Sequence, residues 1–230
     1  MATRIVDGSK FALSGIKAAD ITQENGDKIL RDIPIYAAIE RMDAPTYQRI
    51  LSEFVNGLQR GKSTDELTTQ ISPILNQLFE EALPHVASTI LVEYVEMTVK
   101  HMKLLNQESG AACYMYANPQ SDRSGLLVTI GSRFPTIGQD QGAMKTKVFD
   151  AYRGKIPLGA DGDLISRSIA DVVKFLERRF GQEANIMAKD EVNPSEYSSY
   201  CRVVAAFYEE TLRLPSHVRA ATLRKLFGVK

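Results

Sequence analysis

Apolar residues recur along this chain with the period of an α-helix in every long segment. One example is the stretch 46–58, whose apolar stripe consists of Tyr47, Ile50, Leu51, Phe54, Val55 and Leu58. Spacings of three and four residues are typical of amphipathic helices, whereas a half-buried strand alternates at every second residue. The segments predicted to be helical on this basis are 33–42, 46–58, 63–82, 85–106, 139–153, 163–180, 193–212 and 215–228.

The middle of the chain is less clear. Residues 125–131, GLLVTIG, form an apolar run too short for periodicity to distinguish a helix from a strand, and we favour a helix. The fold class predicted is all-α, as an irregular multi-helix bundle of about seven to nine helices. We expect a single helical domain over 33–230, preceded by a segment 1–32 that is flexible or loosely docked.

Local signals mark several helix starts. Ser63 and Glu66 form an S-x-x-E capping box, in which each side chain bonds the other residue's backbone N–H. The run 193–196, NPSE, combines an N-cap residue, a proline at the first helical position and an acid at N3. Pro73 lies inside the helix predicted over 63–82 and is expected to kink it.

Charge and length exclude some classes of function. The chain has 230 residues with 28 basic and 28 acidic side chains, so its formal net charge is zero. Non-specific nucleic-acid binding depends on a positive field, and the balance therefore argues against a general polyanion binder. We expect any charged partner to be recognised locally.

No apolar run reaches the roughly 18 residues of a transmembrane helix. The N-terminal region lacks the continuous apolar core of a secretory signal. Taken as it stands, the chain is therefore expected in the cytoplasm. If it is instead a soluble fragment of a longer protein, a periplasmic or other extracytoplasmic location is favoured. The sequence leaves both locations open.

Cys113 and Cys201 are the only cysteines in the chain. Free cysteine behaves as a small apolar side chain and is often buried, so one interpretation is a pair of packed thiols. The other is a disulfide between the segment 110–117 and the helix that begins at Asn193. Its chain-entropy contribution would be roughly 4 to 5 kcal/mol, and it would imply an oxidising compartment.

Histidine gives no sign of metal binding. The three histidines, His85, His101 and His217, belong neither to an H-E-x-x-H motif nor to the Glu-x-x-His pattern of di-iron bundles. We predict packed or surface roles for them, and no metal or other cofactor.

Carboxylates offer a second class of chemistry. Glu93, Glu96 and Lys100 fall on one helical face, which favours a solvated surface. An acid/base hydrolase or lyase built from these acids with Tyr94 or Tyr197 is the alternative, and it requires the side chains to converge in the fold.

The C-terminal segment is basic. From Arg213 to Lys230 it contains no acid, and Arg219, Arg224 and Lys225 form a candidate contact surface for a membrane or a nucleic-acid backbone. The same cations also complement the dipole at a helix C-terminus, and this structural interpretation is favoured.

A family resemblance rests on the order of several residues. They are Tyr47 in a helix, Gly61-Lys62-Ser63 before a capping box, Leu83-Pro84 opening a long helix, Cys113, Cys201, and Leu214-Pro215 with Arg219. In this order the chain resembles uncharacterised bacterial helical proteins over about residues 33–226. The resemblance implies a soluble extracytoplasmic domain behind an N-terminal membrane anchor and brings no activity with it. Membrane association would then depend on an anchor missing from this sequence.

These observations favour a non-enzymatic role. We expect a helical binding or structural module with an unknown protein partner, associated with the cell envelope if the chain is a fragment. The alternatives are the acid/base hydrolase or lyase, and the membrane-surface or nucleic-acid binder that would use the basic C-terminal helix.

Overall fold

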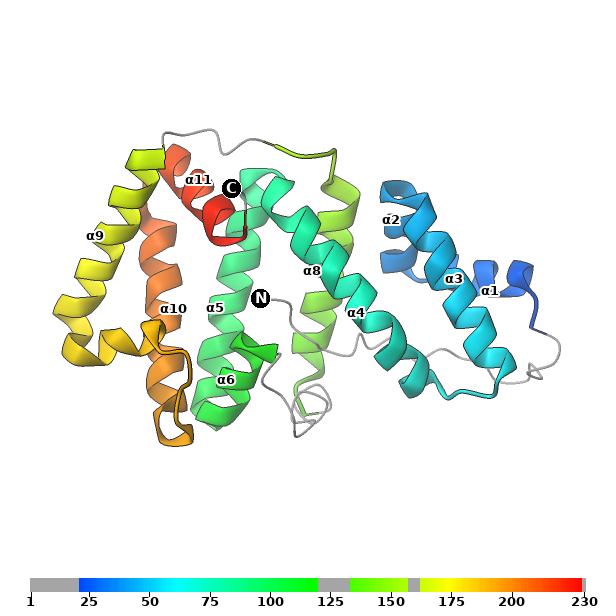
Figure 1. Ribbon diagram of the computed structural model, residues 1–230, viewed down its shortest axis with the longest axis horizontal. Coiled ribbons are helices and arrows are strands. Elements are labelled where there is room, and N and C mark those ends of the chain that lie inside the picture. The colour runs from blue at the N-terminus through cyan, green and yellow to red at the C-terminus, as the bar shows by residue number, and fades with distance from the viewer. Residues whose placement is uncertain (1–20, 120–132, 157–161, 229–230) are drawn as a thin grey trace.

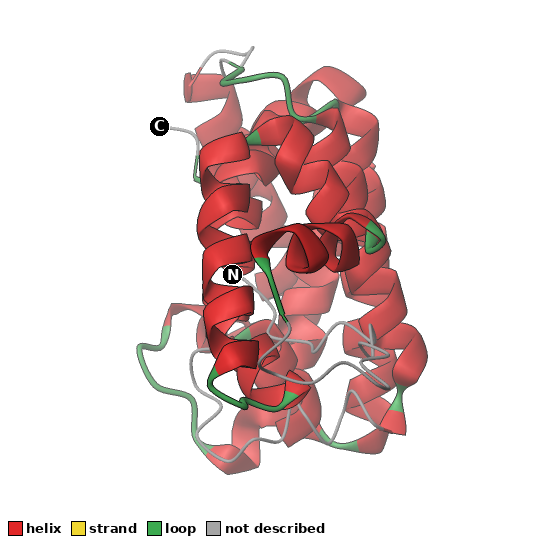
Figure 2. Cartoon of the chain, turned by 90° about the vertical axis from the view of Figure 1, so that its right-hand side faces the viewer, coloured by secondary structure: helices red, strands yellow, loops and turns green. Residues whose placement is uncertain are grey.

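The computed structural model describes residues 21–119, 133–156 and 162–228, and this part of the chain is helical apart from short connections (Figure 1). It contains ten α-helices and no strand, so the all-α class is confirmed, while the helix number exceeds the predicted seven to nine. In Figure 2 the described elements are helices, and the described connections between them are loops and turns. The α-helices are α1 (Gln23–Arg31), α2 (Pro34–Met42), α3 (Ala44–Gln59), α4 (Thr64–Ala82), α5 (Ser88–Glu108), α6 (Gly110–Ala117), α8 (Pro135–Ala151), α9 (Gly162–Phe180), α10 (Tyr197–Arg213) and α11 (Ser216–Leu226). Three 3₁₀ helices accompany them, η2 (Leu83–His85), η4 (Gly181–Ala188) and η5 (Pro194–Glu196).

Two of these helices, α1 and α6, were not predicted from the apolar pattern. Helix α1 is short and mostly polar, and Leu30 is its one large apolar residue that is fully buried. Helix α6 has the sequence GAACYMYA, which is apolar nearly all round and therefore has no one-sided stripe. Ser109 caps its first turn and separates it from α5.

The N-terminal segment predicted over 1–32 lies mostly outside the described residues. Its described part, from residue 21 onward, contains α1, and the buried side chains of Ile21 and Leu30 belong to the core. The packed helices therefore begin at Gln23 rather than at Ile33. The ambiguous run 125–131 also lies outside the described residues.

Helix α5 is central to the molecule and connects two hydrophobic clusters. Its residue Val95 belongs to a cluster with α1 to α4 and most of α8, whereas Met102 and Leu105 belong to a cluster with α6, α9 and α10. In Figure 1, α9, α10, α5 and α8 succeed one another across the molecule, with α1 to α3 at the far end. Because α5 packs into both clusters, its buried faces are fixed in position.

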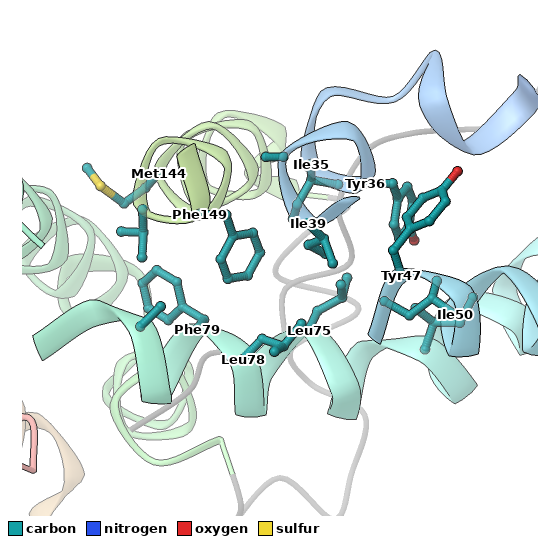
Figure 3. Packing of buried hydrophobic residues seen from close by; sticks show 14 of the residues in the cluster. Ile35, Tyr36, Ile39, Tyr47, Ile50, Leu75, Leu78, Phe79, Met144 and Phe149 are labelled. Atoms are coloured by element: carbon teal, nitrogen blue, oxygen red, sulfur yellow. The ribbon is translucent and has the colours of Figure 1, made fainter. Parts of the chain in front are cut away.

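The first cluster is closed by contacts among α2, α4 and α8. Figure 3 shows Phe149 of α8 and Ile39 of α2 pointing towards Leu75 and Phe79 of α4. The rings of Phe79 and Phe149 meet edge to face with centroids 6.4 Å apart, and both are almost fully buried. Burial of each ring contributes about 2 to 3 kcal/mol.

The helix starts predicted from capping residues are confirmed, whereas α5 begins at Ser88 and α8 at Pro135 rather than at the predicted positions 85 and 139. Ser63 caps α4 with its side chain accepting the N–H of Glu66, whose carboxylate accepts the N–H of Ser63. The Asn193 capping box opens η5, which leads directly into α10. Pro73 lies inside α4. Within the described ranges, no helix has both the length and the apolar content needed to cross a membrane.

Candidate functional site

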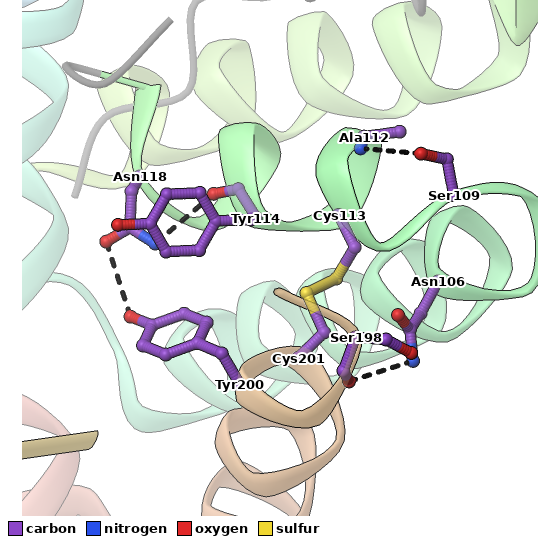
Figure 4. The surroundings of a disulfide bond; sticks show 9 residues. All are labelled: Asn106, Ser109, Ala112, Cys113, Tyr114, Asn118, Ser198, Tyr200 and Cys201. Atoms are coloured by element: carbon purple, nitrogen blue, oxygen red, sulfur yellow. Dashed lines mark hydrogen bonds between the residues drawn. A yellow bond between two sulfur atoms is a disulfide. The ribbon is translucent and has the colours of Figure 1, made fainter. Parts of the chain in front are cut away.

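The two cysteines form a disulfide between α6 and α10. The Cα atoms of Cys113 and Cys201 are 6.2 Å apart, and both side chains are buried (Figure 4). Of the two interpretations of the sequence, the structure therefore has the disulfide rather than free thiols. The bond joins residues 88 positions apart. It holds α6 against the first half of α10.

Polar and aromatic contacts surround the disulfide. The Asn106 side chain donates from Nδ2 to the carbonyl oxygen of Ser198 at 3.3 Å, and the Tyr200 hydroxyl donates to Asn118 Oδ1 at 3.3 Å. Tyr114 of α6 stacks on Tyr197 of α10 with ring centroids 4.0 Å apart. The Tyr114–Tyr197 stack joins the same two helices as the disulfide and gives Tyr197 a packing role. Tyr200 bonds the C-cap residue of α6, and Asn106 ties α10 to α5.

His101 lies in a buried polar network at the contact of α5, α6 and α8. Its Nε2 is 2.9 Å from Asp140 Oδ2 and its Nδ1 is 3.1 Å from the Tyr116 hydroxyl. The Gln141 amide donates to the same hydroxyl at 2.7 Å. Because the tyrosine oxygen accepts from Gln141, its own hydrogen can be donated to Nδ1, and Nε2–H is left to donate to Asp140. Both histidine nitrogens are thus used within the fold.

Burial keeps this histidine neutral. Desolvation lowers the pKa of His101 and outweighs the opposite effect of the neighbouring Asp140 carboxylate. Burial also raises the pKa of Tyr116 well above its ordinary value, so the hydroxyl stays protonated. His101, Tyr116 and Gln141 therefore form an uncharged link between three helices. The link ends at the partly exposed carboxylate of Asp140.

The other two histidines lie elsewhere. His85 belongs to η2 rather than to α5, and its Nδ1 accepts the backbone N–H of Ile156 at 3.0 Å. His217 is exposed in the first turn of α11. Across the described residues, no three His, Cys, Asp or Glu side chains are arranged to hold a metal ion.

The carboxylates and tyrosines of the hydrolase alternative do not converge. Glu93 and Glu96 are exposed on α5, and Glu93 forms an ion pair with Lys147. Tyr94 is buried in the first cluster. There its ring meets Phe79 edge to face, whereas Tyr197 stacks beside the disulfide.

The basic residues of the C-terminal helix do not form one surface. Arg224 is buried, and its Nη2 donates to the Val86 carbonyl oxygen at 3.1 Å, which ties α11 to the start of α5. Arg219 is partly buried and donates from Nη1 to the Leu212 carbonyl oxygen at 2.8 Å. Lys225 is exposed. The fold thus uses the two arginines for internal contacts.

One face of α5 remains open to solvent along most of the helix. Its exposed residues are Thr89, Glu93, Glu96, Lys100, Lys103 and Gln107, which we call the α5 stripe. At 100° per residue they lie within about 80° of arc. The sequence placed Glu93, Glu96 and Lys100 on one face, and the structure extends that face in both directions.

An open groove lies on each side of the α5 stripe. The groove towards α8 has Met97, Ala143 and Met144 among its lining residues, and the groove towards α10 has Val99 and Leu212. Glu96 and Lys100 line both grooves. The stripe and the two grooves form one continuous surface, which we call the α5 face. The stripe is mostly charged, and apolar residues line the grooves beside it.

Comparison of the chain with protein-family models, with curated proteins and with solved structures finds no match. The resemblance to uncharacterised bacterial extracytoplasmic domains stays a prediction.

Proposed function

We propose that this chain is a non-enzymatic helical module that binds a protein partner through the α5 face. The observation that carries the proposal is the combination of an exposed stripe on the central helix with a groove on each side. Protein interfaces combine an apolar centre with a polar rim, and this face offers both kinds of contact.

Rigidity of the supporting helices favours this role. The stripe belongs to a helix of 21 residues whose other faces pack into both hydrophobic clusters. The His101 network and the Cys113–Cys201 bond hold the neighbouring helices in place. A surface fixed before binding loses little conformational entropy when a partner docks.

The proposal includes an oxidising compartment, such as the cell envelope. Disulfides persist in oxidising environments and are rare in the cytosol of most organisms. The chain should therefore have no free thiol when it is expressed with an export signal and two free thiols when it is retained in the cytosol, as measured by thiol titration in denaturant. Quantitative bond formation in the reducing cytosol would remove this support for an extracytoplasmic location.

Binding through the α5 face can be tested by site-specific photocrosslinking in cells that make the chain naturally. A photoreactive amino acid at position 100 should give a discrete crosslinked product. The matched control places it at Val173, which is exposed on α9 at the edge of the molecule. Absence of a product at position 100, or the same products at both positions, would contradict the proposal.

A further inference from the structure

The charges of the α5 stripe are ordered so that, when the stripe is read in the opposite direction, each acid is replaced by a base and each base by an acid. Reading along the helix, a polar residue is followed by two acids, two bases and a second polar residue. Glu96 and Lys100 lie at equal distances on either side of Thr98. The same is true of Glu93 with Lys103. It is also true of the outer pair, Thr89 with Gln107, so the pattern reverses about one point.

We infer that the partner of the α5 face is a second copy of this chain, bound antiparallel across a two-fold axis that passes through the α5 stripe between Glu96 and Lys100, at the level of residue 98. This inference rests on the proposed function, because it assigns a partner to the same face. In an isologous dimer the same patch meets itself, so each contact occurs twice. Glu96 would face Lys100 of the second copy, and Glu93 would face its Lys103.

The charge order also selects the orientation. A parallel pairing in register would bring acids against acids and bases against bases, and like charges at an interface are unfavourable. An antiparallel pairing about this axis gives four contacts between opposite charges. The polar residues Thr89 and Gln107 would then close both ends. The face has equal numbers of acids and bases along its stripe, so the association needs no charged ligand to neutralise it.

Helix α8 supports the same axis. Its Lys147 pairs with Glu93, and its Asp140 lies 3.8 Å from Lys100 Nζ, so α8 runs antiparallel to α5 beside the stripe. Its two charges are opposite in sign, and Ala143 and Met144 lie between them in the chain. Those residues line the groove together with Met97, next to the proposed axis. These apolar residues thus flank the charged stripe at the level of the proposed axis.

The contacts that the stripe makes within one chain leave it available to a second copy. They are the ion pairs of Glu93 with Lys147, Lys100 with Asp140 and Lys103 with Glu209. The three stripe side chains remain 49%, 74% and 54% exposed. Ion pairs at such exposed sites are weak, so their side chains exchange partners at small cost.

A charge-swap experiment tests this dimer. The variant Glu93→Lys/Glu96→Lys makes the stripe wholly basic, and Lys100→Glu/Lys103→Glu makes it wholly acidic. We expect the natural chain to dimerise in sedimentation velocity, and each variant alone to dimerise about tenfold or more weakly because like charges then face each other. An equimolar mixture of the two variants should form the heterodimer.

A matched control separates the pattern from net charge. Asp171→Lys/Glu177→Lys changes the charge by the same amount as the basic variant, at exposed positions of α9. This control should dimerise like the natural chain. A monomeric natural chain at every concentration measured, an undiminished dimer of either stripe variant, or a mixture that stays monomeric would overturn the inference.

The same experiments distinguish this inference from the proposed function. A crosslinked product of twice the chain mass at position 100, together with dimers in sedimentation, supports both. A crosslink to a different protein with a monomeric natural chain leaves the binding module standing and refutes the homodimer. Absence of any crosslink together with a monomeric chain refutes both.

Discussion

Reduction of the Cys113–Cys201 disulfide is expected to lower the free energy of unfolding by about 4 to 5 kcal/mol. The bond closes a separation of 88 residues, and its loss restores that loop's freedom to the unfolded chain. Both cysteines are fully buried, so the reduced thiols remain inside the core as small apolar side chains. The effect is a large part of the free energy of unfolding of a typical folded domain, which is roughly 5 to 15 kcal/mol.

Urea unfolding followed by circular dichroism measures this difference. The oxidised chain is compared with chain that was unfolded, reduced and refolded in reductant. With a dependence on urea of about 3 kcal/mol per molar, the midpoint should fall by about 1.5 M. The Cys113→Ala/Cys201→Ala variant is the control, because reductant should leave its midpoint unchanged.

A midpoint that falls by less than about 0.3 M urea, corresponding to about 1 kcal/mol, would refute this account of the disulfide. So would an equal effect of reductant on the double alanine variant. In either case the contacts between α6 and α10 would hold the two helices together without the covalent bond.

Three further predictions concern single side chains. Ser63→Ala should lower the free energy of unfolding by about 1 kcal/mol in urea, because a first-turn N–H of α4 loses its acceptor, and Ser63→Asp should recover it. Lowering the pH from about 7.5 to about 5.5 should destabilise the chain: burial lowers the pKa of His101 below its ordinary 6.5, so the unfolded chain takes up the proton first. Thermal melts of His101→Gln should lack this part of the pH dependence. Gly110→Ala should cost about 1 to 3 kcal/mol, because the new Cβ would lie 2.7 Å from the backbone nitrogen of Ser198. Gly162→Ala, which meets open space, is its control and should not destabilise the chain.

Each of these has a result that would contradict it. The first is contradicted if Ser63→Ala has the same free energy of unfolding as the natural chain. The second is contradicted if His101→Gln shows the same dependence of melting temperature on pH, and the third if Gly110→Ala is as stable as Gly162→Ala.

Much of the secondary structure could be predicted because its causes are local. The apolar spacing over 46–58 lies within α3, and the Ser63 and Asn193 patterns occur at the helix starts that they predict. Each of these signals acts between residues three or four positions apart. Where local signals are weak, as in the nearly uniform apolar sequence of α6, the helix was missed.

The candidate site depended on tertiary packing to a much greater extent. No local spacing links His101 with Asp140, which are 39 residues apart. Arg224 looked like part of a basic surface, yet it is buried against the start of α5, which lies on a distant part of the chain. A residue's own sequence neighbourhood does not specify which helix will cover it.

The sequence by itself determined the helical class, several helix boundaries, the two cysteines able to pair and the charge order of the α5 stripe, because these follow from composition and from contacts within one turn of helix. Only the tertiary structure decided that the cysteines meet and that the stripe remains uncovered. Both depend on how distant helices pack, since the hydrophobic effect selects which faces are buried across the whole molecule.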